Sequence, residues 1–450
     1  MRNWTPQHIA DVTGARLVAP PTASQGPRGV AIDSRSVAAG DLFVGLPGER
    51  DDGGAFAGPA LAAGAWGVLA TPAHVDAARC AVPGVLLASD DPLRALGRLA
   101  TAWRRELACV VVGVTGSTGK TSTKDILAAL LAPHRRTVSS HANLNTDIGL
   151  PLAVLGARPG TEVLVLEMAM LEAGHIAELS MLAEPDVGVI VNVGPVHLEQ
   201  LGTLEAIAAA KAELIAALPP GGTAVLPAGE ALLERHVRAD VATVRFGEGG
   251  DVRLVREDVG HVSIQAGAER IELDVAFTQA HLRRNLLAAV AAARAIGVTP
   301  RGRVEPEFSA LRGERVVLPG ELVLINDCYN ANPMSMRAAL DDLAATPADR
   351  RVAVLGDMLE LGAGERQFHA DVGRFAGESG VDLLVAVGPR SAAMADAFPG
   401  ESHLVADASE AAALAGDLLA PGDAVLVKAS RGVGLELVAE MLAAAAKAAR

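Results

Sequence analysis

The most constraining feature of the sequence is an apolar run at 109–114 that leads directly into the loop Thr-Gly-Ser-Thr-Gly-Lys-Thr at 115–121. Glycines in such a loop let backbone N–H groups converge on an anion, while the lysine adds positive charge and the last threonine can bind Mg²⁺ at a helix start. A helical pattern follows at 122–131. Although Val114 stands where a strict pattern has glycine, the order of strand, loop and helix favours a phosphate-binding loop over an ordinary tight turn.

The alternation of apolar and helical segments predicts an α/β protein of several domains. Because 450 residues exceed one core of ordinary size, we expect a small N-terminal α/β domain at 1–104, a central domain at 105–314 and a C-terminal domain at 315–450. Strands that are apolar on both faces are typical of a parallel sheet covered by helices. Such runs occur at 108–114, 163–167 and 187–193 in the central domain, and at 321–326, 351–355, 382–387 and 424–428 in the C-terminal domain.

Composition argues against several kinds of partner. The net charge of −14 leaves no extended basic face, so we expect no nucleic-acid partner. We expect no membrane insertion, because no apolar run approaches the roughly 20 residues that span a bilayer. The first residues lack the apolar core of an export signal, so the sequence predicts a cytoplasmic protein. Three cysteines without metal-binding spacing fit a reducing compartment and are interpreted as packing thiols: Cys80, Cys109 and Cys328.

Polar side chains that follow apolar strands are the first candidates for a site, because ligands of open parallel sheets bind beyond the carboxyl ends of the strands. Glu167 ends the run at 163–167, where it could bind Mg²⁺ or have a purely structural role. His197 follows the run at 187–193 and could bind a metal or a phosphate, or neither.

Lys211 is unusual because helical spacing places it on an apolar stripe with Ile207, Leu214 and Leu218. Two interpretations stay open. A desolvated amine has a lowered pKa and can be chemically modified. Alternatively, the stem of the lysine lies on the apolar surface while its amine extends to solvent.

A polar stretch at 327–336 follows another predicted strand. Within it, Asn332 with Pro333 predicts the N-cap and first position of a helix. The stretches at 356–362 and 428–431 also follow strands, and each is either part of a site or a surface loop. Three residues of the first stretch remain for contact with a ligand: Asp327, Tyr329 and Asn330.

Taken together, the motifs resemble those of the ATP-dependent Mur ligases along essentially the whole chain. The residues that carry this resemblance are 115–121, 143–151, Glu167, His197, Lys211, His281 with Asn285, and 327–333. The resemblance implies an N-terminal domain for a uridine nucleotide, a central P-loop ATPase with a parallel sheet, and a C-terminal Rossmann-like domain that closes over the site. The stretches at 327–333 and 356–362 are similar to those of members that join D-alanyl-D-alanine to UDP-N-acetylmuramoyl-tripeptide through an acyl phosphate.

The resemblance also implies ATP and Mg²⁺ as cofactors and assigns roles to individual residues. Catalytic roles fall to Lys120, His197 and Lys211, the last of them as a carbamate. The nucleotide would be bound by Gly116, Ser117, Thr118, Gly119, Lys120, Thr121, Asn285, Asn330 and Asp357. Mg²⁺ would be bound by Thr121, Glu167, His197 and Lys211. The two substrates would contact Asp33, Ser34, Arg35, Asn143, Asn145, Thr146, Asn332, Lys428 and Arg431.

The chain departs from the family pattern at Gly54, Leu282 and Ala429, where histidine, asparagine and glycine are usual. The arginine that the family carries near the domain junction could be Arg312 or Arg315. We expect a monomer, and the third residue of the tripeptide stays open between meso-diaminopimelate and lysine. The alternatives are a sister ligase of the same architecture or a nucleotide-binding regulatory protein without catalysis.

Overall fold

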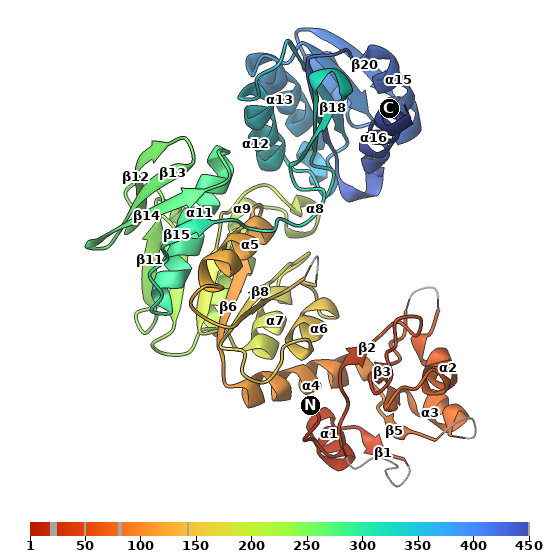
Figure 1. Cartoon of the computed structure of the whole chain (residues 1–450). Coiled ribbons are helices and arrows are strands. Elements are labelled where there is room, and N and C mark those ends of the chain that lie inside the picture. Colours follow the sequence, from red (N-terminus) through yellow and green to blue (C-terminus); the bar gives the residue numbers. More distant parts are fainter. Residues whose placement is uncertain (19–24, 49–50, 80–82, 142–143, 449–450) are drawn as a thin grey trace.

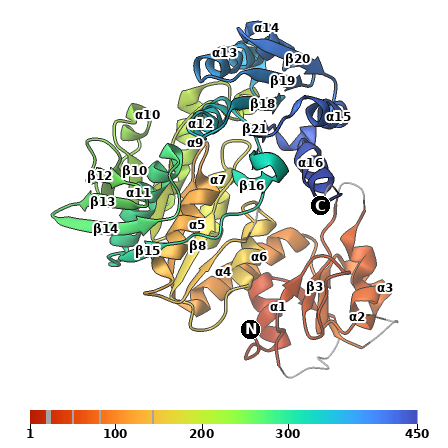
Figure 2. The same cartoon turned by 45° about the horizontal axis from the view of Figure 1, so that its top comes forward.

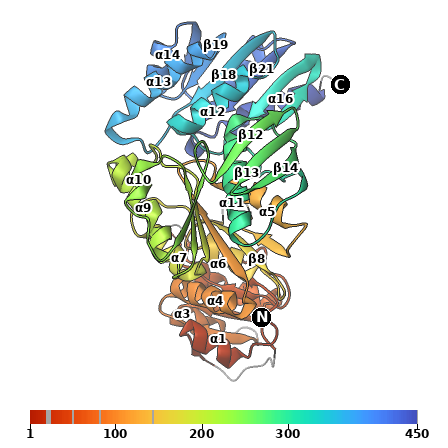
Figure 3. The same cartoon turned by 90° about the vertical axis from the view of Figure 1, so that its left-hand side faces the viewer.

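The chain forms three α/β domains that follow one another in space as they do in sequence (Figures 1 and 3). The computed structural model describes residues 1–450 except 19–24, 49–50, 80–82, 142–143 and 449–450, so Cys80 and Asn143 lie outside the described residues. In the described residues there are three sheets, of five, ten and six strands. The three-domain α/β architecture expected from the sequence is confirmed.

The N-terminal domain is built on the sheet of order β1-β5-β4-β3-β2. Its strands are β1 (Arg16–Leu17), β2 (Val30–Ala31), β3 (Leu42–Val44), β4 (Gly67–Ala70) and β5 (Val85–Ala88). Its helices are α1 (Pro6–Thr13), η1 (Gly53–Phe56), α2 (Ala57–Ala62), α3 (Pro72–Ala78) and α4 (Pro92–Leu107). The predicted boundary at 104 lies inside α4, which passes without interruption toward the central domain.

Helix α4 joins the first two domains through one hydrophobic core. It begins after Asp91, whose carboxylate accepts a hydrogen bond from the backbone N–H of Arg94. The buried face of α4, including Leu99 and Trp103, belongs to a cluster that contains Ile9 of α1 and Leu164 of the central sheet. Because this core is continuous, the N-terminal and central domains form one packed unit.

The central domain contains a ten-stranded sheet of order β15-β14-β13-β12-β11-β10-β9-β6-β8-β7. Its strands are β6 (Val110–Thr115), β7 (Thr137–Ser139), β8 (Val163–Glu167), β9 (Val187–Ile190), β10 (Thr223–Pro227), β11 (Ala242–Phe246), β12 (Val252–Asp258), β13 (His261–Ala266), β14 (Glu269–Val275) and β15 (Gly302–Val304). Its helices are α5 (Lys120–Leu131), α6 (Gly149–Leu155), α7 (His175–Ala183), α8 (Leu198–Leu201), α9 (Leu204–Ala217), α10 (Ala231–Glu234) and α11 (Ala280–Ala295).

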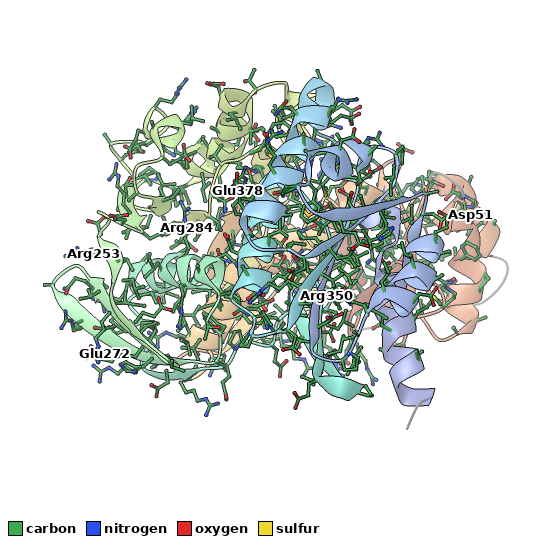
Figure 4. All side chains as sticks on the ribbon, turned by 90° about the horizontal axis from the view of Figure 1, so that it is seen from above. Asp51, Arg253, Glu272, Arg284, Arg350 and Glu378 are labelled. Carbon is green, nitrogen blue, oxygen red and sulfur yellow. The ribbon has the colours of Figure 1, made fainter. Side chains whose placement is uncertain are left out.

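This sheet is mixed, whereas the sequence predicted a parallel one. Strands β6 to β11 are parallel, but β12, β13 and β14 pair antiparallel as a projecting extension. Figure 4 shows Arg253 and Glu272 on this extension, away from the C-terminal domain. Side chains of β14 alternate between exposed and buried, as expected for strands with one covered face.

The C-terminal domain has a six-stranded sheet of order β16-β17-β21-β18-β19-β20, in which the β16–β17 pair is antiparallel. Its strands are β16 (Glu314–Leu318), β17 (Leu322–Asn326), β18 (Arg350–Gly356), β19 (Leu383–Val387), β20 (Glu401–Val405) and β21 (Asp423–Lys428). Its helices are η2 (Pro319–Glu321), α12 (Pro333–Ala344), η3 (Gly362–Gly364), α13 (Glu365–Glu378), α14 (Ala392–Ala397), α15 (Ala408–Leu418), η4 (Arg431–Val433) and α16 (Glu436–Ala448).

The C-terminal domain has hydrophobic clusters of its own, which within the described residues include no side chain of the other two domains. Its helix α12 packs against α11 of the central domain (Figure 2). The carboxyl ends of β6, β8 and β17 therefore meet the same space between the two domains. None of the helices in the described part of the chain is both long and apolar enough to cross a bilayer.

We predict that Leu99→Ala lowers the free energy of unfolding by about 2–5 kcal/mol, because Leu99 is fully buried and the substitution leaves a cavity. The N-terminal and central domains should lose stability together, since they share this core. Urea unfolding followed by circular dichroism measures the effect, and Glu106→Ala on the exposed face of α4 is the matched control. Equal stability of the two variants would contradict the prediction.

Candidate functional site

A cavity of about 1140 Å³ lies between the central and C-terminal domains. The central domain contributes the loop at 116–122, and the C-terminal domain contributes the stretch at 327–335. Most of the predicted site residues meet here: Gly116, Ser117, Thr118, Gly119, Lys120, Thr121, Asn145, Thr146, Glu167, His197, Lys211, Asn285, Asn330, Asn332 and Lys428. Residues predicted from strand ends, such as Glu167 and His197, thus meet residues assigned by the resemblance in one space.

The phosphate-binding loop connects β6 to α5 and holds a conformation that requires glycine at one position. Gly119 has a φ of 74°, and a side chain there would meet the amide of Asn285 at 2.7 Å. The Lys120 ammonium donates to the carbonyl of Gly116 at 3.0 Å. Burial, with some repulsion from Arg312, lowers the pKa of Lys120. An anion bound in the loop would offset the cost of burying the Lys120 ammonium, since it would give the positive charge a counter-charge.

Asn192 is a site residue that the sequence analysis missed. It follows β9, and its Oδ1 accepts a hydrogen bond from the backbone N–H of Thr118 at 2.9 Å. Its Nδ2 donates to the Thr118 hydroxyl at 2.9 Å. Ser117 and Gly194 form a second tie between the same two segments, with a hydrogen bond of 3.0 Å from the serine hydroxyl. A signal was present, because Asn192 is the one polar side chain within the apolar run at 187–193.

Glu167 lies at the carboxyl end of β8 and is 1% exposed. Its Oε2 accepts from the Thr121 hydroxyl at 2.7 Å, and its Oε1 accepts from Asn145 Nδ2 at 2.8 Å. A hydroxyl beside a carboxylate fits Mg²⁺, which uses one or two protein carboxylates and completes its shell with phosphate oxygens and water. In the described ranges no three His, Cys, Asp or Glu side chains come close enough to hold a metal by themselves.

Lys211 is buried in α9, with 1% of its surface exposed, and it lines the cavity. It therefore does not extend its amine to bulk solvent, which was one of the two interpretations. Burial, reinforced by the nearby Lys120 charge, holds the pKa of Lys211 well below its usual value. No carboxylate of the described residues forms an ion pair with it. The amine is thus favoured in its neutral, nucleophilic form.

His197 connects the central domain to the C-terminal domain. Its Nδ1 lies 2.5 Å from Glu360 Oε2, and the backbone of His197 is left-handed, with a φ of 52°. This contact is the main cause that lowers the pKa of Glu360. A second contact joins the same segments: the backbone N–H of Glu199 donates a hydrogen bond to the carbonyl of Glu360 at 3.3 Å. The stretch at 356–362 is therefore an interdomain contact.

The C-terminal face of the cavity is held together by Lys428. Its ammonium donates to Asp327 Oδ2 at 2.6 Å and to the carbonyl of Asn330 at 2.8 Å. Asn332 caps α12 in a reciprocal pair with Ser335, as the sequence predicted, and also lines the cavity. Lys428 thus fixes the shape of the loop that carries Asn330.

The structure distinguishes the two arginines near the domain junction, although both line the cavity. Arg315 forms an ion pair with Asp342 at 2.7 Å. Arg312 lies over the Tyr329 ring, 3.8 Å from its centroid, and its buried Nε has no partner in the described part of the chain. Arg312 therefore keeps a donor available for a ligand.

Several predicted site residues do not line the cavity. Asp33, Ser34 and Arg35 lie in the N-terminal domain after β2, where the arginine lowers the pKa of the Asp33 carboxyl to about 2. Asp357 is buried, and its Oδ1 accepts from the Ser391 hydroxyl at 2.9 Å. Arg431 pairs with Glu436 at 3.2 Å.

At Gly54, where the resemblance implies a histidine, the space for a side chain is taken by the ring of His74. A side chain on Gly54 would meet the ring of His74, which extends from α3. The Nε2 atom of His74 lies 2.8 Å from Asp52 Oδ2. The imidazole missing at 54 is therefore replaced, in space, by one that comes from elsewhere in the chain.

Comparisons with known proteins agree with this geometry. Family models described as "Mur ligase family, catalytic domain", "Mur ligase middle domain" and "Mur ligase, glutamate ligase domain" match residues 27–104, 114–293 and 311–431. The chain is 37% identical over 424 residues to the UDP-N-acetylmuramoyl-tripeptide--D-alanyl-D-alanine ligase of Synechocystis sp., with 92% of each chain covered.

Two solved structures extend this similarity to the fold. MurF from Acinetobacter baumannii superposes with a TM-score of 0.87 at 29% identity, over 98% of this chain and 99% of that one. MurF from Thermotoga maritima, solved in complex with ADP, gives 0.81 at 30% identity, over 94% and 99%.

We predict that Asn192→Ala weakens binding of an ADP analogue by about tenfold or more, because the partly buried backbone N–H and hydroxyl of Thr118 lose their partner. Fluorescence titration measures the Kd. Asn192→Asp keeps an acceptor but adds a negative charge beside the loop, which repels the phosphates, so its Kd should also rise. Unchanged affinity in the alanine variant would show that the loop keeps its shape without this tie.

Proposed function

The chain belongs to the Mur ligase family, and we propose that it ligates D-alanyl-D-alanine to UDP-N-acetylmuramoyl-tripeptide with ATP. The observation that carries the proposal is the cavity between the domains, which combines a phosphate-binding loop, the Thr121–Glu167 pair and the buried Lys211. The relative from Synechocystis bears the name of this activity and aligns over 92% of its length.

The reaction needs an activated carboxyl group, because a carboxylate is a poor electrophile. The terminal carboxylate oxygen of the tripeptide attacks the γ-phosphorus of ATP, the bond to ADP breaks, and an acyl phosphate forms. The amine of D-alanyl-D-alanine then attacks the acyl carbon, a proton leaves the nitrogen, and inorganic phosphate departs as the amide forms. The loop backbone, Lys120 and Arg312 supply positive charge where the transferred phosphoryl group carries its negative charge.

Mg²⁺, when bound, neutralises phosphate charge and orients the transferred group. Thr121 and Glu167 would hold it, and His197 would join them after release from Glu360. Lys211 is proposed as a carbamate: its neutral amine adds to CO₂ with loss of a proton, and the product carries an anionic oxygen pair. That oxygen pair would face the cations of the cavity, which offsets the burial of its charge.

The remaining assignments follow the division of the chain. Residues 1–104 would hold the uridine nucleotide through Asp33, Ser34 and Arg35, residues 105–314 would hold ATP, and residues 315–450 would close over both. Asn285 and Asn330 would lie near the adenine. Asp357 would act near the ribose only after a rearrangement that frees its carboxylate from Ser391. Closure protects the acyl phosphate from water. The working protein would be a cytoplasmic monomer.

The proposed function is tested by phosphate release from ATP and Mg²⁺ with UDP-N-acetylmuramoyl-tripeptide, with and without D-alanyl-D-alanine. We expect release to require both substrates and mass spectrometry to find the UDP-linked pentapeptide. Tripeptides ending in meso-diaminopimelate or lysine give the third-residue preference. Phosphate release with single amino acids or folates instead would assign the chain to a sister ligase. No phosphate release with any acceptor would refute catalysis.

We predict that Lys211→Ala lowers kcat by about a hundredfold or more, the scale of losing one electrostatic group in an active site. Acetate or formate should partly restore the rate, because a small carboxylate can occupy the space of the carbamate. Lys211→Arg keeps the positive charge but cannot form a carbamate, so it should be equally slow. A fully active arginine variant would refute the carbamate.

The same residue predicts a pH dependence. The pKa of Lys211 is held well below its usual value by burial and by the Lys120 charge, so more of its amine is in the neutral form that reacts with CO₂ than for an exposed lysine, and this neutral fraction decreases as the pH falls. Activity of enzyme stripped of CO₂ and then returned to a constant concentration of dissolved CO₂ should therefore recover faster at higher pH. Recovery independent of pH would contradict this assignment.

A further inference from the structure

We propose that Lys124 and Asp125 are positioning residues that tie the phosphate-binding helix both to Glu167 and to the crossing between the central and C-terminal domains. The two side chains form an ion pair of 2.5 Å in α5, and they are only 2% and 8% exposed. Removing two charges from water costs free energy unless further hydrogen bonds satisfy them. The other hydrogen bonds that these two side chains make indicate the role of the pair.

The first branch leads to Glu167. The Lys124 ammonium donates to the backbone carbonyl of Ser140 at 2.8 Å. The hydroxyl of the same serine accepts a hydrogen bond from the backbone N–H of Glu167 at 3.0 Å. Lys124 therefore fixes the residue that holds the end of β8, from which the Glu167 carboxylate reaches Thr121.

The second branch leads to the domain crossing. Asp125 Oδ2 accepts hydrogen bonds from the backbone N–H and the hydroxyl of Ser309, at 3.2 and 3.3 Å. The preceding residue, Phe308, packs edge-on against Phe277 of the central domain, with ring centroids 5.9 Å apart. The chain is thus fixed on the central domain as far as Ser309.

On the other side of the crossing, the chain is fixed to the C-terminal domain at Leu311. Its carbonyl accepts a hydrogen bond from the backbone N–H of Tyr329 at 3.1 Å, and its backbone is left-handed, with a φ of 62°. Only Ala310 separates these two attachments (Figure 1 shows the segment after β15 that makes the crossing). Arg312 follows at once and lines the cavity.

The ion pair thus lies on the helix that begins with Lys120 and sets the points from which both Glu167 and Arg312 reach the cavity. Because Asp125 of α5 contacts Ser309 directly, a displacement of the phosphate-binding loop and α5 would reach the crossing at Ala310 through that contact. The inference depends on the proposed function only for its kinetic readout.

The test replaces the pair by apolar residues of similar size, in Lys124→Met/Asp125→Leu, because such replacements of a buried ion pair usually preserve folding. The matched control is Arg350→Met/Asp423→Leu, which removes an ion pair of 2.6 Å inside the C-terminal domain, away from the cavity. Spin labels at Ala216 and Glu378 report the distance between the domains, with Cys80 changed to serine and Cys109 and Cys328 buried. Arg350 and Glu378 are labelled in Figure 4.

In the test variant, we expect the distance distribution to broaden and kcat to fall by about ten- to a hundredfold, the effect of a misplacement of about 1 Å. The Kd for ATP should change by less than about threefold, since the loop itself is intact. The control should keep the wild-type distribution and kcat. Distances and Kd need no turnover, so they decide the inference even where the ligase assay fails.

Three results would overturn the proposal. One is a wild-type distribution with a wild-type kcat in the test variant. Another is equal broadening in test and control variants. The last is parallel loss of ATP affinity and thermal stability, which would make the pair merely structural. If the double variant does not fold, Ser309→Ala and Ser140→Ala each remove one hydroxyl contact, and an unchanged kcat and distribution in both would also reject the proposal.

Discussion

The convergence of basic side chains on one cavity is the constraint on which the site depends. Lys120, Lys211 and Arg312 line one cavity, and the charge of one lowers the pKa of another. Without an anion, their burial is a cost that the rest of the fold must offset. The shared core around α4 and the hydrogen bonds of Asn192 hold these groups in place despite that cost. The positive groups that line the cavity therefore favour the binding of phosphate groups.

The sequence predicted the parts of the site that depend on local order. The loop at 115–121 and Glu167 at the end of its strand follow from the spacing of apolar residues, which sets strand ends and helix faces. The same spacing placed Lys211 on an apolar stripe but left open whether its amine is buried. It also predicted the cap at Asn332, because Asn-Pro at a helix start is a local signal.

The parts that the sequence did not reveal depend on contacts between distant segments. Asn192 meets the loop across 74 positions, Glu360 meets His197 across 163, and Ser309 meets Asp125 across 184. The choice of Arg312 over Arg315 depends on which guanidinium finds a carboxylate, and no local pattern encodes that. The antiparallel extension of the central sheet was missed although a local signal was present, because residues 269–275 alternate between exposed and buried as in a strand with one covered face.

The continuous core beneath α4 has a geometric consequence. Because the N-terminal and central domains pack as one unit, the separation between the end of β2 and the phosphate-binding loop is fixed. Within the described residues, the C-terminal domain has hydrophobic clusters of its own and does not share this core. Under the proposed function, a substrate held by its nucleotide at the N-terminal domain would present its reacting carboxylate at a set distance from the loop. Such a frame would select substrates by the length of their peptide stem before any side chain is recognised.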